Sequence, residues 1–336
     1  MNIKEKLIIT NLPSFYKIEL YNRIAEQKDI LVIYTGENGS DRNKDFFHGS
    51  MKFDSLFLKG DIIKKVSQLL NVLYKINYQE LIASGWDSLF VWLAVWISPR
   101  RKNSVVVEST IKESVLTGIK GWLKKLFVKK ITKAYVSGTP HAQLMNALGF
   151  KGNLVITKGV GLFHYRPQPP FVPRSEVRQF LYVGRLVPVK NLEFLIEKFN
   201  QHPELELTVI GFGILENKLK SIAKDNIHFL GAVDNEKLPT YYQNADIFIL
   251  PSLSEPWGLV VEEALNNGTP VMVSEQVGCA EDLVNENTGV VFSLKKNDFD
   301  TKLNEIRDIN RYNSMRRFIS TLDYEKIEQE QVNCYL

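Results

Sequence analysis

The sequence contains little cysteine and no long apolar run. Its two cysteines, Cys279 and Cys334, lie far apart, so neither a disulfide framework nor a paired metal-ligand spacing is indicated. The longest apolar stretch covers residues 89–97, which is too short to cross a bilayer as a helix. The N-terminus has no apolar run of the length that a signal peptide needs. We therefore expect a cytoplasmic protein without a transmembrane segment.

The chain also lacks a strong charge of either sign. Its 42 Lys and Arg residues against 38 Asp and Glu residues give a formal net charge of +4. This balance does not call for a nucleic-acid partner, and none is expected. A length of 336 residues exceeds the size at which a single core usually keeps growing. Two domains are therefore expected.

Short β-rich runs alternate with helical patterns through the first half. Strands are expected at 6–10, 30–36, 80–84, 104–109 and 133–138, with helices at 17–27 and 61–75. A second series predicts strands at 178–185, 205–211, 227–231, 246–252, 270–274 and 289–293, with helices at 190–199, 213–224, 236–244 and 258–267. Strands that alternate with helices predict parallel sheets covered on both faces. Ligands bind at the carboxyl ends of the strands in such sheets.

Proline marks the division between the two series. Residues 167–173 hold four of the 13 prolines, and neither a helix nor a central strand tolerates that density. We place a first domain at 1–165, a linker at 166–177, a second domain at 178–310 and a helical tail at 311–336. Packing of this tail against the first domain is one option. The expected fold is α/β, with two Rossmann-like domains that face each other across a cleft.

Three glutamates surround a Pro-Trp-Gly tripeptide in the second series. Glu255 follows a predicted strand, and Glu262 and Glu263 lie in the next predicted helix, which ends at Gly268. Proline suits the start of a helix, so the amides of the first helical turn should be available to an anion such as a phosphate. A solvated acidic face is the alternative interpretation. The amides concerned belong to Gly258, Leu259 and Val260.

The spacing of two of these glutamates resembles a family signature. Glu255, seven residues and then Glu263, with Pro-Trp-Gly after the first, is similar to the signature of family 4 retaining glycosyltransferases, which have the GT-B fold. The resemblance implies that Glu255 contacts the sugar of a nucleotide-sugar donor and that Glu263 contacts its ribose. It leaves Glu262 as a bystander in a solvated or packing role.

Further motifs extend the resemblance over about residues 178–293. The segment "YVGRLVPVKN" is similar to the family's Gly-Arg-Leu followed by lysine, which implies that Arg185 and Lys190 hold the donor diphosphate. Fixed cations stabilise the negative charge that develops on a leaving diphosphate. Taken without the downstream motif, the same two cations are ordinary surface charge. Softer resemblances imply donor contacts by Gly184, Gly211, Phe212 and Val233.

The N-terminal half is expected to hold the acceptor. Polar residues that follow predicted strands are candidate acceptor or sugar contacts, and a plain strand-to-helix turn is the alternative. Many relatives carry a histidine where this chain has Glu108. The candidates are Ser14, Tyr16, Trp86, Asp87, Glu108 and Ser109.

Residues 119–133 form a basic amphipathic pattern with six lysines. Ile119, Trp122, Leu123 and Phe127 share one face of a helix, together with Leu126. Such a helix can lie on an anionic membrane surface, or it can pack its apolar face on the sheet and leave its lysines in water. If the helix lies on the membrane, we expect the protein to be peripheral at the inner face of that membrane.

These observations favour sugar transfer with retention of configuration. The resemblance implies attack on the face from which the diphosphate leaves. A nucleophilic role for Glu255 ranks lower, because its carboxylate would have to reach the opposite face of the anomeric carbon. No Asp-x-Asp metal motif serves the diphosphate, since the two cations do so, and no divalent metal or other cofactor is expected. The alternatives are a sugar-nucleotide epimerase with this fold and a non-catalytic nucleotide-sugar-binding protein. An acceptor in surface polysaccharide or glycoconjugate biosynthesis is expected by analogy.

Overall fold

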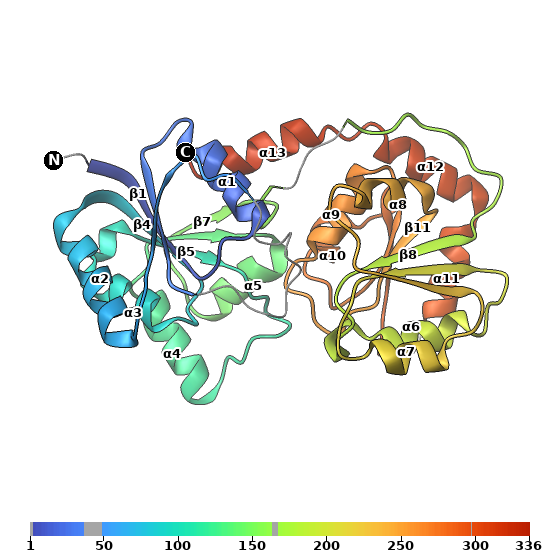
Figure 1. The fold of residues 1–336 in the computed structure, drawn as a ribbon, viewed down its shortest axis with the longest axis horizontal. Helices are drawn as coiled ribbons and strands as arrows, with labels where there is room; N and C mark the ends of the chain where they lie inside the picture. The colour runs from blue at the N-terminus through green and yellow to red at the C-terminus, as the bar shows by residue number, and fades with distance from the viewer. Residues whose placement is uncertain (1–2, 37–48, 163–166, 297) are drawn as a thin grey trace. The chain divides into compact units, whose positions relative to one another are not determined.

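The computed structural model describes residues 3–36, 49–162, 167–296 and 298–336. The chain divides into two compact units, residues 1–163 with 327–336 and residues 164–326. Each unit is built on one parallel sheet covered by helices (Figure 1). The predicted α/β class with two parallel-sheet domains is confirmed. The boundary predicted at 165/166 lies outside the described residues.

The first sheet has seven strands in the order β3-β2-β1-β4-β5-β6-β7. They are β1 (Ile3–Thr10), β2 (Ile30–Tyr34), β3 (Asp54–Phe57), β4 (Asn77–Ser84), β5 (Asn103–Val107), β6 (Lys133–Val136) and β7 (Asn153–Ile156). The edge strands β3 and β7 were not predicted. Both are short and contain no buried residue. Within their bounds β3 has two consecutive apolar residues and β7 has three, fewer than the continuous run by which a buried parallel strand is recognised.

Successive residues of β1 serve two different cores, because strand side chains alternate between faces. Leu7 and Ile9 belong to the core shared with α2 (Ile62–Lys75), α3 (Leu89–Ile97), α4 (Gly118–Val128) and α5 (Thr139–Ala147). Ile8 belongs to the opposite core, with α1 (Phe15–Ala25) and the end of α13 (Tyr324–Asn333). In that core Tyr335 stacks on Tyr135 with ring centroids 4.5 Å apart. The last residues of the chain thus complete the first unit.

The second sheet has six strands in the order β10-β9-β8-β11-β12-β13. They are β8 (Gln179–Val183), β9 (Glu206–Ile210), β10 (Ile227–Gly231), β11 (Ile247–Leu250), β12 (Val271–Ser274) and β13 (Gly289–Phe292). The helices are α6 (Leu192–Phe199), α7 (Glu216–Ile222), α8 (Leu238–Asn244), α9 (Leu259–Asn266), α10 (Ala280–Leu283), α11 (Phe299–Arg307) and α12 (Ile309–Ile319). No helix among the described residues of either unit combines the length and apolarity needed to span a membrane.

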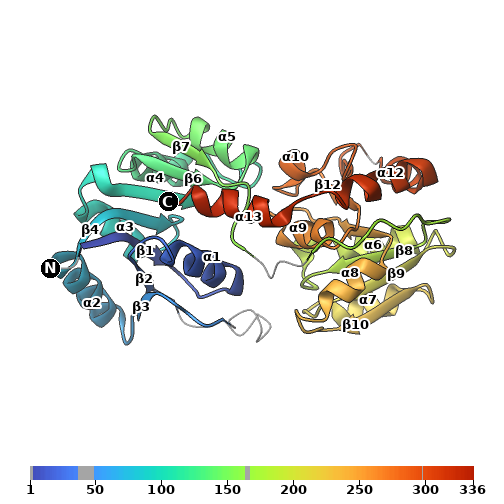
Figure 2. The same cartoon turned by 90° about the horizontal axis from the view of Figure 1, so that it is seen from above.

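The proline-rich segment at 167–177 forms neither helix nor strand and is fastened to the second unit, as the view from above also shows (Figure 2). The Gln168 side chain donates to the Leu265 carbonyl oxygen of α9 over 3.0 Å. Arg174 exchanges two hydrogen bonds with Asn313 of α12, of 2.9 and 3.0 Å. The segment therefore packs along its own domain.

The order of strands reverses next to the first strand of each sheet. The two reversal points lie between β1 and β4 and between β8 and β11. Loops leaving the two flanking strands diverge to opposite faces there, which opens a crevice outside the carboxyl ends of the strands. Ligands are therefore expected at these two edges.

Candidate functional site

Two glycine-containing loops lie against each other at the carboxyl ends of β8 and β9. The Gly184 amide donates to the Ile210 carbonyl oxygen over 3.0 Å, and the Leu186 amide donates to that of Phe212 over 2.9 Å. A Cβ atom on Gly211 would lie 1.9 Å from the Gly184 carbonyl oxygen, so only glycine fits there. The predicted donor contacts Gly184, Gly211 and Phe212 are thus gathered in one pair of loops.

Val233 lies beyond the neighbouring strand end. The Gly211 amide donates to the carbonyl oxygen of Gly231, the last residue of β10, over 2.8 Å. Val233 follows two residues later and is half-buried. It therefore continues the row of loops at this edge of the sheet.

Lys190 and Glu255 form an ion pair at the reversal point of the second sheet. Lys190 ends a short 3-10 turn after β8, and Glu255 lies in the loop after β11. The Lys190 Nζ atom donates to Glu255 Oε2, and the two side chains are only 14% and 15% exposed. The Leu253 amide donates to the Val189 carbonyl oxygen over 2.8 Å, which joins the two loops beside the pair. The fold thus brings together two predicted site residues that are 65 positions apart.

Arg185 belongs to the same corner. The buried Tyr182 hydroxyl donates to the Arg185 carbonyl oxygen over 3.0 Å. Burial raises the pKa of Tyr182 well above its usual range, the negative charge of Glu255 raises it further, and the positive charge of Arg185 lowers it. Both charges act on one hydroxyl group, so Arg185 and Glu255 share the surroundings of Tyr182.

The loop after β11 ends at Gly258, the N-cap residue of α9. This residue has a φ of +102°, a conformation that strongly favours glycine. The first-turn amides of α9, among them those of Leu259 and Val260, have no acceptor within the helix, and they carry the positive end of the helix dipole. The Gly278 amide donates to the Glu255 carbonyl oxygen over 2.8 Å, which holds Glu255 in front of this helix.

Glu262 is buried rather than solvated. The Trp257 indole Nε1 donates to its carboxylate, and the two residues are 2% and 7% exposed. Of the two roles expected for Glu262, the solvated one is therefore wrong and the packing one holds. The pair anchors the Pro-Trp-Gly turn to α9.

Glu263 has a different partner from Glu255. The hydroxyl of the buried Tyr242, on α8, donates to Glu263 Oε2 over 2.9 Å. Burial raises the pKa of Glu263 to about 7, against the opposing effect of the Tyr242 hydrogen bond. Tyr242 was not predicted as a site residue, because nothing in its local sequence indicates that it faces a helix 21 positions away.

The first unit has a cavity of about 380 Å³ at its own reversal point. Four predicted contacts line it: Trp86, Asp87, Glu108 and Ser109. Ser14 and Tyr16 do not belong to its lining. The Ser14 hydroxyl is buried and has no hydrogen-bond partner among the described residues. The Tyr16 carbonyl oxygen accepts the Leu162 amide over 2.9 Å.

Lys17 also lines this cavity and was not predicted from the sequence. Its Nζ atom lies 2.5 Å from Glu108 Oε1, and the Ser84 hydroxyl donates to the same oxygen over 2.9 Å. Burial alone would lower the pKa of Lys17. The charge of Glu108, the hydrogen bond to it and the neighbouring Tyr16 and Tyr21 together outweigh burial and raise that pKa above the usual range. Burial likewise favours a raised pKa for Glu108, but the Lys17 charge together with the hydrogen bonds from Lys17 and Ser84 reverses this and lowers that pKa. Both groups are therefore charged at neutral pH.

One Asp-x-Asp tripeptide does occur, at Asp298 to Asp300, but its carboxylates have other partners. Asp300 Oδ2 accepts from Lys198 Nζ over 2.6 Å, and Asp298 Oδ1 accepts the Ser293 amide over 2.7 Å. Among the described residues, no group of three or more His, Cys, Asp or Glu side chains is arranged to hold a metal ion.

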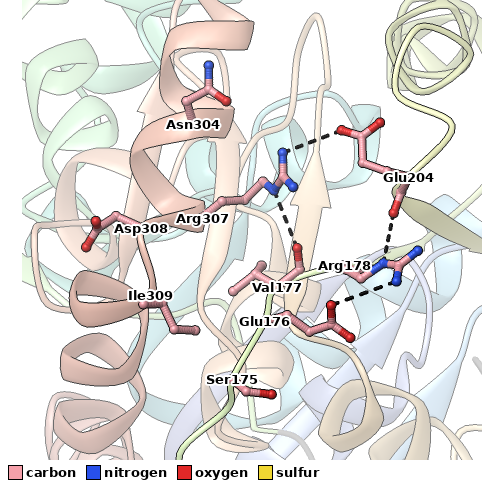
Figure 3. Close-up of a pocket in the computed structure, with 9 residues that line it drawn as sticks. All are labelled: Ser175, Glu176, Val177, Arg178, Glu204, Asn304, Arg307, Asp308 and Ile309. Carbon is pink, nitrogen blue, oxygen red and sulfur yellow. Dashed lines mark hydrogen bonds and ion pairs between the residues drawn. The ribbon is translucent and has the colours of Figure 1, made fainter.

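A larger hollow of about 630 Å³ lies at the opposite edge of the second sheet, where the chain enters β8 (Figure 3). Its two cations are paired with carboxylates: Arg178 with Glu176 at 3.8 Å, and Arg307 with Glu204 at 3.7 Å. This hollow lies at the amino end of β8, and both of its cations are already paired with carboxylates. We therefore assign the candidate site to the carboxyl edge instead.

The fold is shared with known transferases. The solved structure of the pneumococcal O-GlcNAc transferase GtfA in complex with UDP and GlcNAc matches with a TM-score of 0.70 at 12% identity, over 99% of this chain and 98% of that chain. This chain has the GT-B fold. Residues 168–320 match the family described as "Glycosyl transferases group 1". The family match thus covers the unit that holds Lys190, Glu255 and Glu263.

Two curated relatives are glycosyltransferases by name. The uncharacterised glycosyltransferase MJ1607 of Methanocaldococcus jannaschii is 29% identical over 177 residues, which are 48% of this chain and 45% of that protein. The O-antigen biosynthesis glycosyltransferase WbnH of Escherichia coli is 27% identical over 315 residues, which are 86% of this chain and 85% of that one. The chain thus spans just under half the length of the first relative and most of the second. The family and these relatives support a GT-B glycosyltransferase.

Proposed function

We propose that this GT-B protein transfers a sugar from a nucleotide-sugar donor to a glycan or lipid-linked acceptor in surface polysaccharide or glycoconjugate biosynthesis. The Lys190–Glu255 ion pair at the reversal point of the second sheet carries the proposal. In this pair Lys190 is a cation that suits phosphate, and Glu255 is a carboxylate that suits sugar hydroxyls. Both precede the N-terminus of α9. The E. coli O-antigen relative, which matches along most of both chains, supports the class of pathway.

Each donor group has a residue suited to it. Lys190, Arg185 and the first turn of α9 would bind the diphosphate, whose negative charge grows as the bond to the sugar breaks. Glu255 would accept hydrogen bonds from sugar hydroxyls. Glu263, oriented by Tyr242, would accept those of the ribose. The loops of Gly211, Phe212 and Val233 would line the nucleoside.

We further propose that the product retains the anomeric configuration of the donor. The acceptor hydroxyl oxygen bonds to the anomeric carbon on the face from which the diphosphate leaves, and the departing phosphate oxygen takes the hydroxyl proton. Protein cations supply the positive charge, so turnover needs no divalent metal and should persist in EDTA. NMR of the first-formed product gives its configuration, and inversion would contradict this step. A covalent sugar adduct on Glu255 would favour double displacement instead.

The cavity in the first unit suits a polyhydroxylated acceptor. It is lined by the hydroxyl groups of Thr10, Thr35 and three serines, together with the charged pair Lys17 and Glu108. Both partners of Glu108 bind its Oε1 atom, and its side chain is 43% exposed. Its other oxygen is thus available to an acceptor hydroxyl.

Replacement of Glu108 by glutamine should therefore raise the acceptor KM about tenfold, since a hydrogen bond to a charged group is lost. The donor KM should not change. Glu113→Gln, in the same unit but outside the cavity lining, is the matched control. Steady-state kinetics with each substrate varied separately makes the test. An effect confined to the donor KM would contradict the acceptor assignment.

Donor binding should strengthen with pH as Glu263 ionises. Its carboxyl group has a pKa near 7, and the ionised form accepts hydrogen bonds from the ribose hydroxyls more strongly than the protonated form does. The donor Kd should therefore fall about tenfold between pH 6 and pH 8, following the ionised fraction. Calorimetric titration with an intact nucleotide sugar measures this, because its diphosphate does not titrate in that range.

Glu263→Gln is the control for this pH dependence. It should bind the donor weakly and equally at both pH values. A raised folded-state pKa means that Glu263 contributes stability below its unfolded pKa and that this contribution is lost as pH rises to about 7. The glutamine variant should therefore have a higher Tm than wild type at pH 8, which separates weak binding from misfolding. A pH-independent wild-type Kd would contradict the ribose role.

A panel of UDP-, GDP-, CMP- and dTDP-sugars, with and without an acceptor extract, tests the function as a whole. Release of free nucleotide together with a glycosylated acceptor supports transfer. An altered sugar nucleotide without acceptor would show epimerisation, and a thermal shift without turnover would show binding alone. UDP-sugars come first in the panel, because the GtfA structure holds UDP.

A further inference from the structure

Helix α4 leaves most of its predicted apolar face uncovered. Ile119 is 78% exposed, Trp122 is 59% exposed and Leu123 is 38% exposed. Only the end of the helix packs inward, where Phe127 is fully buried against the rings of Trp86 and Trp92. Packing on the sheet therefore accounts for the last turn of α4 and leaves the first two turns unexplained.

The end of α3 extends this exposed surface. Trp96 and Ile97 are 42% and 37% exposed, and Lys130 lies over the Trp96 ring at 5.4 Å. The next turn, Arg100–Lys102, is tied to α4 by a 2.9 Å hydrogen bond from Arg100 Nε to the Lys129 carbonyl oxygen. Both helices cover the same face of the first sheet (Figure 1). We call these exposed residues of α3, the following turn and α4 the α3–α4 surface.

The charged side chains of this surface are all cations. The sequence contains no Asp or Glu from residue 114 to residue 175. None of the exposed cations of the surface has a carboxylate partner among the described residues. They are Arg100, Arg101, Lys120, Lys125 and Lys129. The lysines of α7 in the second unit differ, since Lys218 pairs with Glu193 and Lys220 with Glu216.

We propose that the α3–α4 surface binds an anionic lipid bilayer. Ile119, Trp122 and Leu123 project from one end of α4 and would enter the interface, where an indole ring has both apolar and polar surroundings. The cations around them would contact lipid phosphates, whose field attracts basic side chains near the membrane surface. The charge complementarity selects this occupant, because every exposed charged side chain of the surface is a cation and an anionic bilayer has a negative surface. The inference is independent of the proposed function, since lipid binding requires no donor and no turnover.

The full chain should float with vesicles of phosphatidylcholine mixed with phosphatidylglycerol and should not float with phosphatidylcholine vesicles alone. The triple variant Lys120→Gln, Lys125→Gln, Lys129→Gln should lose on the order of 100-fold in partitioning to the anionic vesicles, from about fivefold per cation. Trp122→Ala should lose about tenfold, the effect of one large apolar side chain. Both variants should keep the wild-type Tm, because the changed side chains are exposed.

Matched controls come from the second unit. Lys218→Gln, Lys220→Gln, Lys224→Gln makes the same change in net charge, and Ile214→Ala truncates a side chain that is 83% exposed. Both controls should bind anionic vesicles like wild type. Equal losses in the two lysine triples would show that net charge alone drives binding, which would overturn the assignment to this surface. Absence of wild-type binding to anionic vesicles would overturn it too, as would self-association that Trp122→Ala abolishes while vesicle binding stays unchanged.

Discussion

Replacement of Lys190 by methionine is expected to lower kcat for sugar transfer by on the order of 100- to 1000-fold, as loss of one fixed charge-stabilising donor does in other enzymes. The Lys190 ammonium group lies at the reversal point of the second sheet and is held there with Glu255. In the proposed reaction it meets a diphosphate whose charge increases in the transition state. The lost interaction is therefore stronger in the transition state than in the ground state, so kcat falls further than donor affinity.

Methionine keeps most of the length of the side chain, so a folding defect can be separated from a chemical one. The Tm of Lys190→Met should stay close to that of wild type, and its affinity for the nucleoside diphosphate product should be weaker. Lys218→Met is the matched control, since it breaks another Lys–Glu pair of the same domain, exposed and 2.5 Å long. Surface pairs of that kind contribute little, so the control should be fully active. Wild-type kcat in purified Lys190→Met would refute the diphosphate assignment.

The residues of the candidate donor site could be selected from the sequence because they lie in short motifs. Glu255, in the loop before α9, and Glu263, within α9, are eight positions apart, and Lys190 follows Arg185 by five positions. The alternation of strands and helices along the chain is enough to place such residues at the carboxyl ends of parallel strands. The pairing of Lys190 with Glu255, and the burial of Glu262 by Trp257, depend on contacts between separate loops and side chains that this alternation does not specify.

The residues that were missed are joined over long separations. Lys17 meets Glu108 across 91 positions, and Tyr242 meets Glu263 across 21. No periodicity encodes such a pair, because it depends on which strands are neighbours in the sheet. The apolar face of α4 shows the same limit. Its spacing predicted five residues on one side, but of these five only Phe127 is buried.

Replacement of Glu255 by glutamine should abolish most transfer while binding of the nucleoside diphosphate stays at least as tight as in wild type. Glutamine keeps an oxygen that accepts the Lys190 hydrogen bond but removes the negative charge that the sugar hydroxyls would contact. It also frees Lys190 from a competing carboxylate, because Glu255 and the diphosphate would bind the same ammonium group. A loss of on the order of 100-fold in kcat is expected from the loss of sugar positioning.

The two substitutions thus predict opposite effects on product affinity. Lys190→Met weakens binding of the nucleoside diphosphate, whereas Glu255→Gln does not. Glu193→Gln, which removes the partner of Lys218, controls for loss of a carboxylate in this domain. Calorimetry with the free nucleoside diphosphate and kinetics with the intact donor give the two quantities separately. If both variants lost product affinity equally, the Lys190–Glu255 pair would serve only to hold its two loops together. The phosphate and sugar contacts would then have to be assigned to other residues of this edge.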